Sequence, residues 1–389
     1  MASTFADIVK RQEKAWGVSS IMESVDRSVG DKIPFSSPMM NWATYGGIPR
    51  NKMTEFFGEP GGGKSSTAVD ICKHAVELFE QEFEDQIQEL SQKVSSGNKA
   101  ASVELDDLKD RGPKKVLYID LEHAFDTKWC ATLGLDRSDV EIMQPPDVPA
   151  EDILNMLDDI IQTDEFGLVV LDSIPSLVTK TELEKKLGEK TVSALAGLLT
   201  VWCRKVVSLL TRYSTTLLVI NQIRDNMDNP YVVNTPGGKA LKFYSSLRIF
   251  FRLGTPVDFL GQELPQKEEN PAGHIINAKL VKQKTAPFDR KLGTYYLLAK
   301  SGIHPEFDFA NLAIKKYGII RKSGAWFTVY VPGSSDILEF EGKPIKLNGL
   351  AKVYDFLNNN LTYYNDLRKF IEDDINGDEK PLETTGDLI

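Results

Sequence analysis

Residues 53–66 read MTEFFGEPGGGKSS, and this stretch decides the fold. It begins as a short apolar strand, turns through a run of glycines and continues as a helix. From Gly58 to Ser65 it matches the pattern G-x-x-x-x-G-K-[S/T] at every fixed position, and such glycines let backbone N–H groups turn inward around phosphate oxygens. The positive N-terminal end of the helix that starts near Gly63 attracts the same anions. We therefore expect a phosphate-binding P-loop made of Glu59, Pro60, Gly61, Gly62, Gly63, Lys64, Ser65 and Ser66.

Beyond this loop the chain alternates strand and helix patterns. Near-continuous apolar runs occupy residues 115–120, 166–174 and 215–223, and helical patterns separate them. Such runs are typical of strands that are buried on both faces of a parallel sheet. Further strand-like runs within 240–300 could extend that sheet. The alternation predicts an α/β, doubly wound fold with a mostly parallel, twisted sheet.

Three polar residues stand where these strands end: Asp172 closes LVVLD, Glu122 follows KVLYID, and Gln222 closes VINQ. The carboxyl ends of parallel strands meet at one edge of a sheet, so we expect all three beside the P-loop. Lys64 would contact the β- and γ-phosphates, while Ser65 and Asp172, partly through water, would hold Mg²⁺. Glu122 would position or activate the attacking water, and the Gln222 amide would report the γ-phosphate. A solvated turn carboxylate and a polar strand-end cap are the alternatives for the last two.

Composition excludes several classes of protein. The chain has 389 residues and a net charge of −10, which argues against nucleic-acid binding over the whole surface but allows a local basic channel. We find no apolar run long enough to span a bilayer and no signal-peptide core, so we expect a cytoplasmic protein with no membrane partner. The three cysteines, Cys72, Cys130 and Cys203, are scattered. We expect them to be small buried side chains rather than metal ligands.

Changes in pattern predict four parts along the chain. They are an N-terminal helix and linker (1–35), a core (36–302) with a polar insertion (80–114), a small C-terminal domain (303–370) and an acidic tail (371–389). The helix is expected over residues 4–16. We expect the insertion to be a solvated helical hairpin or a flexible segment, with partner binding as the alternative. The tail has little to bury, so we expect it to be disordered.

Taken together, the motifs resemble those of the RecA recombinase family. YIDLEHAFD (118–126) resembles the family's FIDAEHALD, VINQIR (219–224) resembles FINQIR, and VKQKTAPF (281–288) resembles VKNKIAAPF. TPGGKALKFYSSLRI (235–249) likewise resembles TTGGNALKFYASVRL. The resemblance covers nearly the whole chain. It implies a RecA-like P-loop ATPase core with a short N-terminal helical segment and a small α+β C-terminal domain, and it implies ATP and Mg²⁺ as cofactors.

The resemblance also implies roles for single residues in nucleotide binding. Glu122 corresponds to the catalytic glutamate, and Gln222 to the amide that leads into the second DNA-binding loop. Trp129 corresponds to an aromatic residue that stacks on adenine, and Asp126 lies near the same base. Without the family, Trp129 would be assigned to the core.

A further set of residues is implied to act between subunits. Lys282 and Lys284 correspond to a lysine pair that reaches the ATP of the adjacent subunit. Lys242 and Phe243 correspond to the interface segment of that same site. The resemblance therefore implies a helical filament in which ATP lies between protomers.

Two segments, 181–190 and 224–238, correspond to the family's DNA-binding loops. Glycines in the second loop would let the backbone approach a DNA phosphate, and its apolar side chains could wedge between bases. The insertion and a more basic first loop depart from the family pattern, which favours a phage or other mobile-element recombinase. The DNA-binding residues that we expect are Lys185, Lys186, Arg204, Arg224, Met227, Tyr231, Gly237 and Gly238.

The expected function is ATP-dependent homologous pairing and strand exchange by a filament on single-stranded DNA. Its partners would be single- and double-stranded DNA, further copies of itself, and single-strand-binding and loader proteins. A RecA-like hexameric helicase or motor is the alternative. A non-catalytic regulatory paralogue is a third class, and the intact Lys64, Ser65, Glu122 and Asp172 argue against it.

Overall fold

The computed structural model describes residues 10–11, 14, 32–186, 194–224 and 234–376. The chain divides into two compact units, Met1–Asp31 and Lys32–Ile389. In the first unit Lys10, Arg11 and Lys14 are helical, and the rest of the helix expected over 4–16 lies outside the described residues. Residues 32–35, which we expected to be linker, belong to the second unit, where Ile33 and Phe35 are buried in the core.

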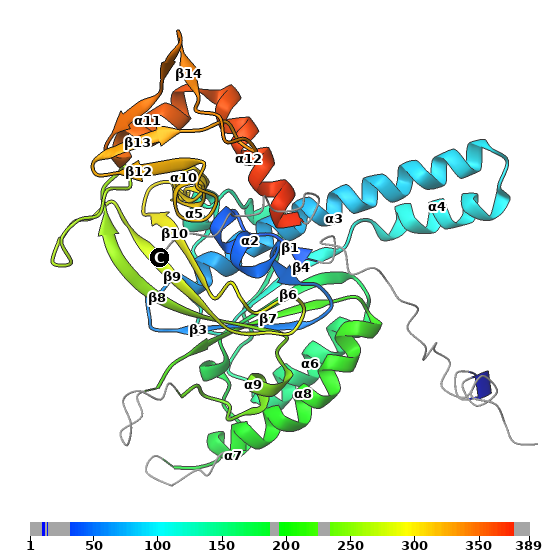
Figure 1. The fold of residues 1–389 in the computed structure, drawn as a ribbon. Coiled ribbons are helices and arrows are strands. Elements are labelled where there is room, and N and C mark those ends of the chain that lie inside the picture. Colours follow the sequence, from blue (N-terminus) through cyan, green and yellow to red (C-terminus); the bar gives the residue numbers. More distant parts are fainter. Residues whose placement is uncertain (1–9, 12–13, 15–31, 187–193, 225–233, 377–389) are drawn as a thin grey trace, which may run out of the picture. The chain divides into compact units, whose positions relative to one another are not determined.

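Among the described residues, one central sheet has nine strands in the order β11-β10-β9-β8-β3-β7-β6-β4-β5 (Figure 1). Strands β8, β3, β7, β6, β4 and β5 are parallel neighbours, and β9, β10 and β11 continue the sheet antiparallel. Their bounds are β3 Met53–Gly58, β4 Lys115–Asp120, β5 Glu141–Met143, β6 Phe166–Asp172, β7 Thr216–Gln222, β8 Leu247–Val257, β9 Gly273–Gln283, β10 Leu292–Leu298 and β11 Gly302–Ile303. The predicted α/β fold and the extension of its sheet are confirmed.

Helices cover both faces of this sheet, because each face carries its own apolar cluster. One cluster joins buried residues of α3 (Lys64–Ser95), such as Ile71, to β4 and β8. The other joins α6 (Ala150–Gln162) and α8 (Ala194–Arg212) to β6 and β7. The smaller elements are β1 Lys32–Ile33, α2 Pro38–Thr44, β2 Ile48–Pro49, α5 Thr127–Thr132, α7 Lys180–Leu183 and α9 Ala240–Tyr244.

Helix α8 differs from what the sequence led us to expect in one respect. Of the described helices, it alone is long and apolar enough to cross a membrane by length and composition, whereas we had found no such run. Its buried residues, Leu199, Trp202, Cys203, Val206 and Leu210, belong to the apolar cluster on the sheet. The helix therefore packs as a core element of the α/β fold.

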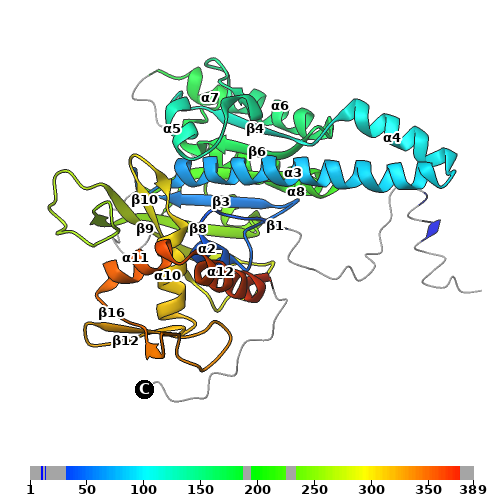
Figure 2. The ribbon, with the colours of Figure 1, turned by 90° about the horizontal axis from the view of Figure 1, so that it is seen from above.

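Of the two structures expected for the insertion 80–114, a helical hairpin or a flexible segment, the hairpin is present. Helix α3 continues unbroken from the P-loop to Ser95, and α4 (Lys99–Arg111) returns beside it. A small cluster of Leu90, Ala101, Leu105 and Leu108 holds the two helices together. Figures 1 and 2 show the hairpin projecting away from the sheet.

The C-terminal part contains the helices α10 (Pro305–Lys315), α11 (Leu350–Asn359) and α12 (Leu361–Asn376). It also contains two small sheets. One is formed by β12 Ile320–Ser323, β13 Trp326–Val329 and β16 Lys346–Asn348, and the other by β14 Glu339–Phe340 and β15 Lys343–Pro344. Its apolar cluster includes Met39, Tyr296 and Leu298 from the core. The prediction of a disordered tail from residue 371 is wrong for residues 371–376. They complete α12, because Ile371 and Ile375 are buried. Residues 377–389 lie outside the described part.

Candidate functional site

The P-loop connects β3 to α3 at the carboxyl edge of the sheet. Strand β3 ends at Gly58, and Gly63 precedes the first residue of α3, with φ of 88° in the left-handed region that favours glycine. A Cβ atom on Gly58 would lie 1.9 Å from the carbonyl oxygen of Phe251, and one on Gly63 would lie 2.9 Å from the hydroxyl of Tyr295. The loop therefore depends on glycine both for its conformation and for its packing on β8 and β10.

Lys64 is buried at the start of α3, and its side chain lies along the loop. Its Nζ atom donates hydrogen bonds to the carbonyl oxygens of Gly58, at 3.2 Å, and Glu59, at 2.7 Å. Burial lowers the pKa of Lys64, and the nearby Asp172, Glu122 and Glu59 partly offset this. A buried ammonium group with only carbonyl partners is well suited to receive anionic oxygens.

Ser65 and Asp172 lie in contact, as a shared Mg²⁺ site requires. The Ser65 hydroxyl donates to Asp172 Oδ2 at 2.8 Å, and the Tyr118 hydroxyl donates to the same oxygen at 2.6 Å. Burial raises the pKa of Asp172, with the charges of Glu122 and Asp120 acting in the same direction and the two hydrogen bonds opposing them. No group of three or more His, Cys, Asp or Glu that could hold a metal occurs among the described residues. One hydroxyl and one carboxylate fit Mg²⁺, which takes its remaining ligands from phosphates and water.

Glu122 and Gln222 are brought together, as predicted. The Gln222 side-chain amide donates to Glu122 Oε1 at 3.0 Å, and the Ser173 hydroxyl donates to the same oxygen. The three residues lie at the carboxyl ends of β7, β4 and β6, which are neighbours in the sheet. A carboxylate at this edge is thus hydrogen-bonded directly to the amide that closes β7.

Sequence reasoning missed the residues that hold this arrangement. Asp120, the last residue of β4, accepts hydrogen bonds from the backbone N–H groups of Glu122, at 3.2 Å, and Phe125, at 3.0 Å. The side-chain amide of Gln144 also donates to Asp120, at 2.8 Å. Asp120 therefore fixes the turn that carries Glu122. A second carboxylate in the motif YIDLEH was the available signal.

The two residues expected near adenine have structural partners as well. The Trp129 indole N–H donates to the Ser66 hydroxyl at 3.0 Å, so the indole lies beside the P-loop helix. Asp126 caps α5 by accepting from the backbone N–H groups of Lys128, at 2.8 Å, and Trp129, at 3.2 Å. Asp126 thereby orients the segment that bears Trp129.

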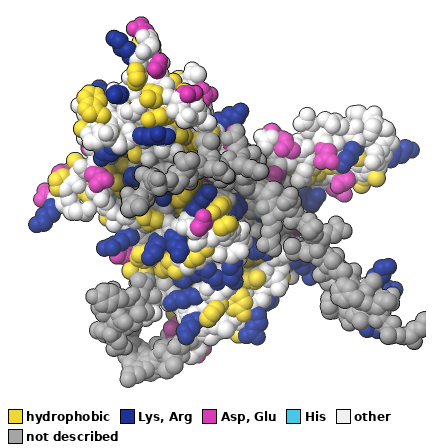
Figure 3. Space-filling view, in the orientation of Figure 1, with side chains coloured by type: hydrophobic (Ala, Val, Ile, Leu, Met, Phe, Trp, Pro, Cys, Tyr) yellow, Lys and Arg dark blue, Asp and Glu magenta, His cyan; other side chains and the backbone are white. Residues whose placement is uncertain are grey.

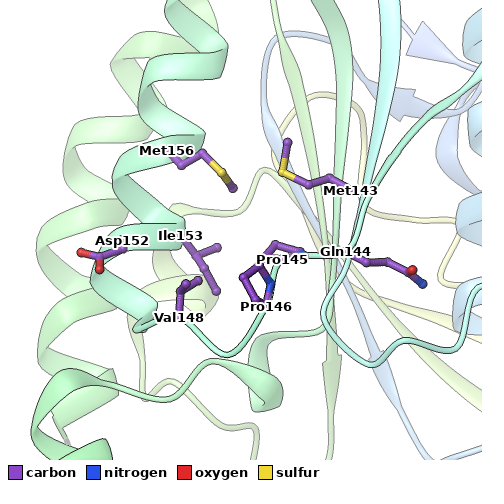
Figure 4. A pocket seen from close by; sticks show the side chains of 8 residues that line it. All are labelled: Met143, Gln144, Pro145, Pro146, Val148, Asp152, Ile153 and Met156. Carbon is purple, nitrogen blue, oxygen red and sulfur yellow. The ribbon is translucent and has the colours of Figure 1, made fainter.

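An open apolar cavity of about 370 Å³ lies between the end of β5 and the start of α6 (Figure 4). In Figure 4 Met143, Val148, Ile153 and Met156 face one another, and Gln144 points away from them. The cavity contains none of the phosphate-site residues. It borders the site only through Gln144 and its hydrogen bond to Asp120.

Lys282 and Lys284 are not brought to the P-loop of their own chain. Lys282 is paired with Arg248 in β8, and the backbone N–H of Lys284 donates to Ser246, which precedes that strand. Across β8, Lys282 is therefore level with Glu55 and Lys284 with Met53 of β3. The P-loop follows the end of β3, about 10 Å farther along the strand direction from Lys282 and about 17 Å from Lys284. Lys282 Nζ donates to the carbonyl oxygens of Lys242, at 2.6 Å, and Phe243, at 2.7 Å. Lys284 Nζ donates to Phe243 at 3.1 Å.

The residues expected to bind DNA are only partly described. Residues 225–233, which include Met227 and Tyr231, lie outside the described residues, as do residues 187–190 of the first segment. Arg224 and Asn234 form a β-bridge that closes the second loop at its base. Gly237 and Gly238 have φ of 84° and 73° and pack against the first turns of α8. Of the predicted cations, Lys186, Arg204 and Arg224 are exposed and Lys185 is half-buried.

On the face shown in Figure 3, Lys and Arg side chains gather with apolar ones over the lower part of the core, where Figure 1 places β7, α8 and α9. Phe243 in α9 is 67% exposed, and Val201 in α8 is 66% exposed. Arg204 and Lys205 in α8 and Lys239 beside α9 are exposed cations of the same elements. This mixed basic and apolar surface is local, because the chain as a whole carries a net charge of −10.

A glycine-rich loop between a buried strand and a helix, facing a strand-end aspartate, defines a P-loop nucleotide-binding protein. A model of the RecA N-terminal domain matches residues 84–304. The protein RecA of Thermus aquaticus is 30% identical over 326 residues, 82% of each chain. The protein RecA of Streptomyces rimosus is 28% identical over 380 residues, 96% of this chain and 86% of its own, an alignment that includes the P-loop. The protein RecA of Heliobacterium modesticaldum is 31% identical over 324 residues, 81% of this chain and 80% of its own. The chain belongs to the RecA family of ATP-dependent recombinases.

Proposed function

We propose that this protein is a DNA-dependent ATPase that forms filaments on single-stranded DNA and catalyses homologous pairing and strand exchange in the cytoplasm. The observation that carries the proposal is the hydrogen bond from Gln222 to Glu122 at 3.0 Å. It connects the phosphate edge of the sheet directly to the segment that begins at Arg224 and closes at Asn234. Ligands at the two sites can therefore influence each other through one side chain.

In this function ATP binds at the P-loop with its phosphates on Lys64 and the loop N–H groups. Bound Mg²⁺ would neutralise phosphate charge, held by the Ser65 hydroxyl and, through water, by Asp172. Glu122 orients or deprotonates the attacking water, because it follows the end of β4 at this edge and is held there by hydrogen bonds from Ser173 and Gln222. Tyr118 and Ser173 hold the carboxylates of Asp172 and Glu122 in place.

The ATP site is completed between subunits in this proposal. Lys282 and Lys284 of one protomer contact the nucleotide of the next, and the exposed Phe243 packs in the contact between them. Their position at the edge of the sheet opposite their own P-loop supports a role in trans. Cations supplied this way stabilise the charge that develops on the departing phosphoryl group.

DNA binds along 181–190 and 224–238, with Arg204 and Arg224 on phosphates and Gly237 and Gly238 presenting backbone N–H groups. The basic and apolar surface over α8 and α9 supports this assignment. Single-stranded DNA enters first and a duplex second, and single-strand-binding and loader proteins assist.

The test of this function is joint-molecule formation between a single strand and a homologous duplex in the presence of ATP. We expect joint molecules with the wild type and none with Lys64→Ala, which also loses ATP turnover. A wild-type protein that forms no joint molecules at any magnesium concentration would contradict strand exchange. Electron microscopy on DNA with an ATP analogue separates the helicase alternative, because closed rings instead of filaments would favour it.

A further inference from the structure

A charged residue stands in the middle of the otherwise apolar strand β3. Glu55 is fully buried, and one carboxylate oxygen accepts from Arg248 Nε in β8 at 2.5 Å. The other oxygen accepts from the side-chain amide of Asn221 in β7, at 3.0 Å. One carboxylate therefore joins the three adjacent strands β7, β3 and β8.

On the β7 side this network holds both ends of the second DNA loop. Besides Glu55, the Asn221 amide donates to the carbonyl oxygen of Pro236, at 3.2 Å. The side-chain oxygen of Asn221 accepts from the backbone N–H of Gln222, at 3.0 Å. Pro236 lies where the loop returns, and Gln222 lies where it leaves. A displacement of the loop ends must therefore act on the Glu55 carboxylate.

On the β8 side the same network reaches the lysine pair. Arg248 is paired directly with Lys282 across β8 and β9. Its guanidinium is stacked on the Phe57 ring at 4.4 Å, and its Nη2 atom is buried with no hydrogen-bond partner among the described residues. The guanidinium is thus fixed on one side by Glu55 and retains one unused donor. A small shift of the guanidinium changes the electrostatic field at the Lys282 side chain.

We infer that Glu55, with Arg248, is a positioning element that couples the ends of the second DNA loop to Lys282 and Lys284. The inference rests on the proposed function, since it assigns those lysines to the ATP of the neighbouring subunit. DNA that binds at the loop acts through Asn221 on Glu55, and through Arg248 on the position of the lysines. Binding of DNA by one protomer thereby changes the ATP site that this protomer shares with the next.

The experiment measures how strongly single-stranded DNA changes the affinity of the full-length protein for a non-hydrolysable ATP analogue. The coupling factor is the ratio of the dissociation constants without and with oligo(dT). We expect Glu55→Gln to reduce this factor to within about twofold of one, while the affinities for DNA alone and analogue alone change less than about threefold. Because Glu55→Gln leaves the Arg248 charge buried and unpaired, a Glu55→Gln, Arg248→Gln double variant is measured beside it. It should fold as stably as the wild type and still lack coupling.

The matched control is Asp158→Asn. Asp158 is another buried carboxylate, held by the Trp202 indole N–H at 3.0 Å and by Lys205 at 2.7 Å, and among the described residues it has no hydrogen bond to either loop end. We expect this variant to lose some stability and to keep the wild-type coupling factor. Equal loss of coupling in Asp158→Asn and Glu55→Gln would show that destabilisation alone is responsible and would overturn the inference.

Hydrogen exchange gives a second readout that a purely structural role would not move. Oligo(dT) should protect the backbone amides of Asn234, Thr235, Gly237 and Gly238 in the wild type and in both Glu55 variants, but those of 279–286 in the wild type only. Normal coupling and protection in the double variant would overturn the inference and leave the proposed function intact. A wild type that binds no oligo(dT) would instead remove the proposed function and the inference with it.

Discussion

Assembly in the presence of ATP should weaken above pH 8, because Lys282 loses its charge there. Burial, the neighbouring charge and hydrogen bond of Lys284, and the charge of Arg248 lower the pKa of Lys282 to about 8, and Glu55 opposes them. The other packed element, α9, supplies two carbonyl oxygens and carries Lys242. With this pKa, Lys282 is about nine-tenths charged at pH 7, half charged at pH 8 and about one-tenth charged at pH 9.

The sign follows from the proposed contact with phosphate. Phosphate oxygens favour the ammonium form, so the pKa of Lys282 rises when subunits assemble around ATP. Below about pH 7 the free lysine is already charged and assembly takes up no proton. Above pH 8 each contact must take up a proton, so the assembly constant falls by up to about tenfold for each pH unit.

The assay is light scattering of ATP-dependent assembly on oligo(dT) from pH 6.5 to 9.5, with the critical concentration as readout. Lys282→Arg should assemble with no dependence on pH in this range, because arginine stays charged. Lys32 also has its pKa lowered by burial, to about 8, so this variant separates the two groups. Arg248→Gln should shift the loss of assembly to higher pH, and Glu55→Gln should shift it to lower pH, because Arg248 lowers the pKa of Lys282 and Glu55 raises it. If Lys282→Arg loses assembly above pH 8 as the wild type does, the reasoning is refuted.

Three further outcomes follow from single features. Asp308→Asn should raise the melting temperature at neutral pH and change it little near pH 4. Burial raises the pKa of Asp308 well above its usual range, so the native state holds a proton that the unfolded state releases. The free energy of unfolding therefore falls by about 1.4 kcal/mol per pH unit as the pH rises towards the folded-state pKa. An equal effect of the substitution at both pH values would contradict this. ATP binding should change the fluorescence of Trp129, and Trp129→Phe should abolish that signal; an unchanged signal would place the base elsewhere. Deletion of 377–389 should strengthen duplex binding by removing a polyanion. Deletion of 371–389 should also destabilise the fold, because Ile371 and Ile375 are buried. Duplex affinity that is unaltered across a salt series would count against the role of the polyanion.

The phosphate edge could be predicted from the sequence because its residues share one geometric cause. Strands with near-continuous apolar sequence belong in a parallel sheet, and the carboxyl ends of parallel strands meet at one edge. Asp172, Glu122 and Gln222 each close or follow such a strand, so their convergence on the P-loop needed no knowledge of strand order. The helix at 151–162 was likewise predictable from local periodicity, whereas the polar composition of the insertion left a hairpin and a flexible segment open.

The Glu55 network could not be predicted in this way, because it depends on which strands are neighbours. Glu55, Asn221 and Arg248 are far apart in the chain, and they meet only because β3 lies between β7 and β8. The sequence did carry a signal: an acid within MTEFFG and an arginine within SLRIFF are opposite charges inside two apolar strands. A charge that must be buried in such a strand needs a partner of opposite sign. Two strands that each carry one such charge are therefore candidates for direct neighbours, and here that argument would have placed β8 beside β3.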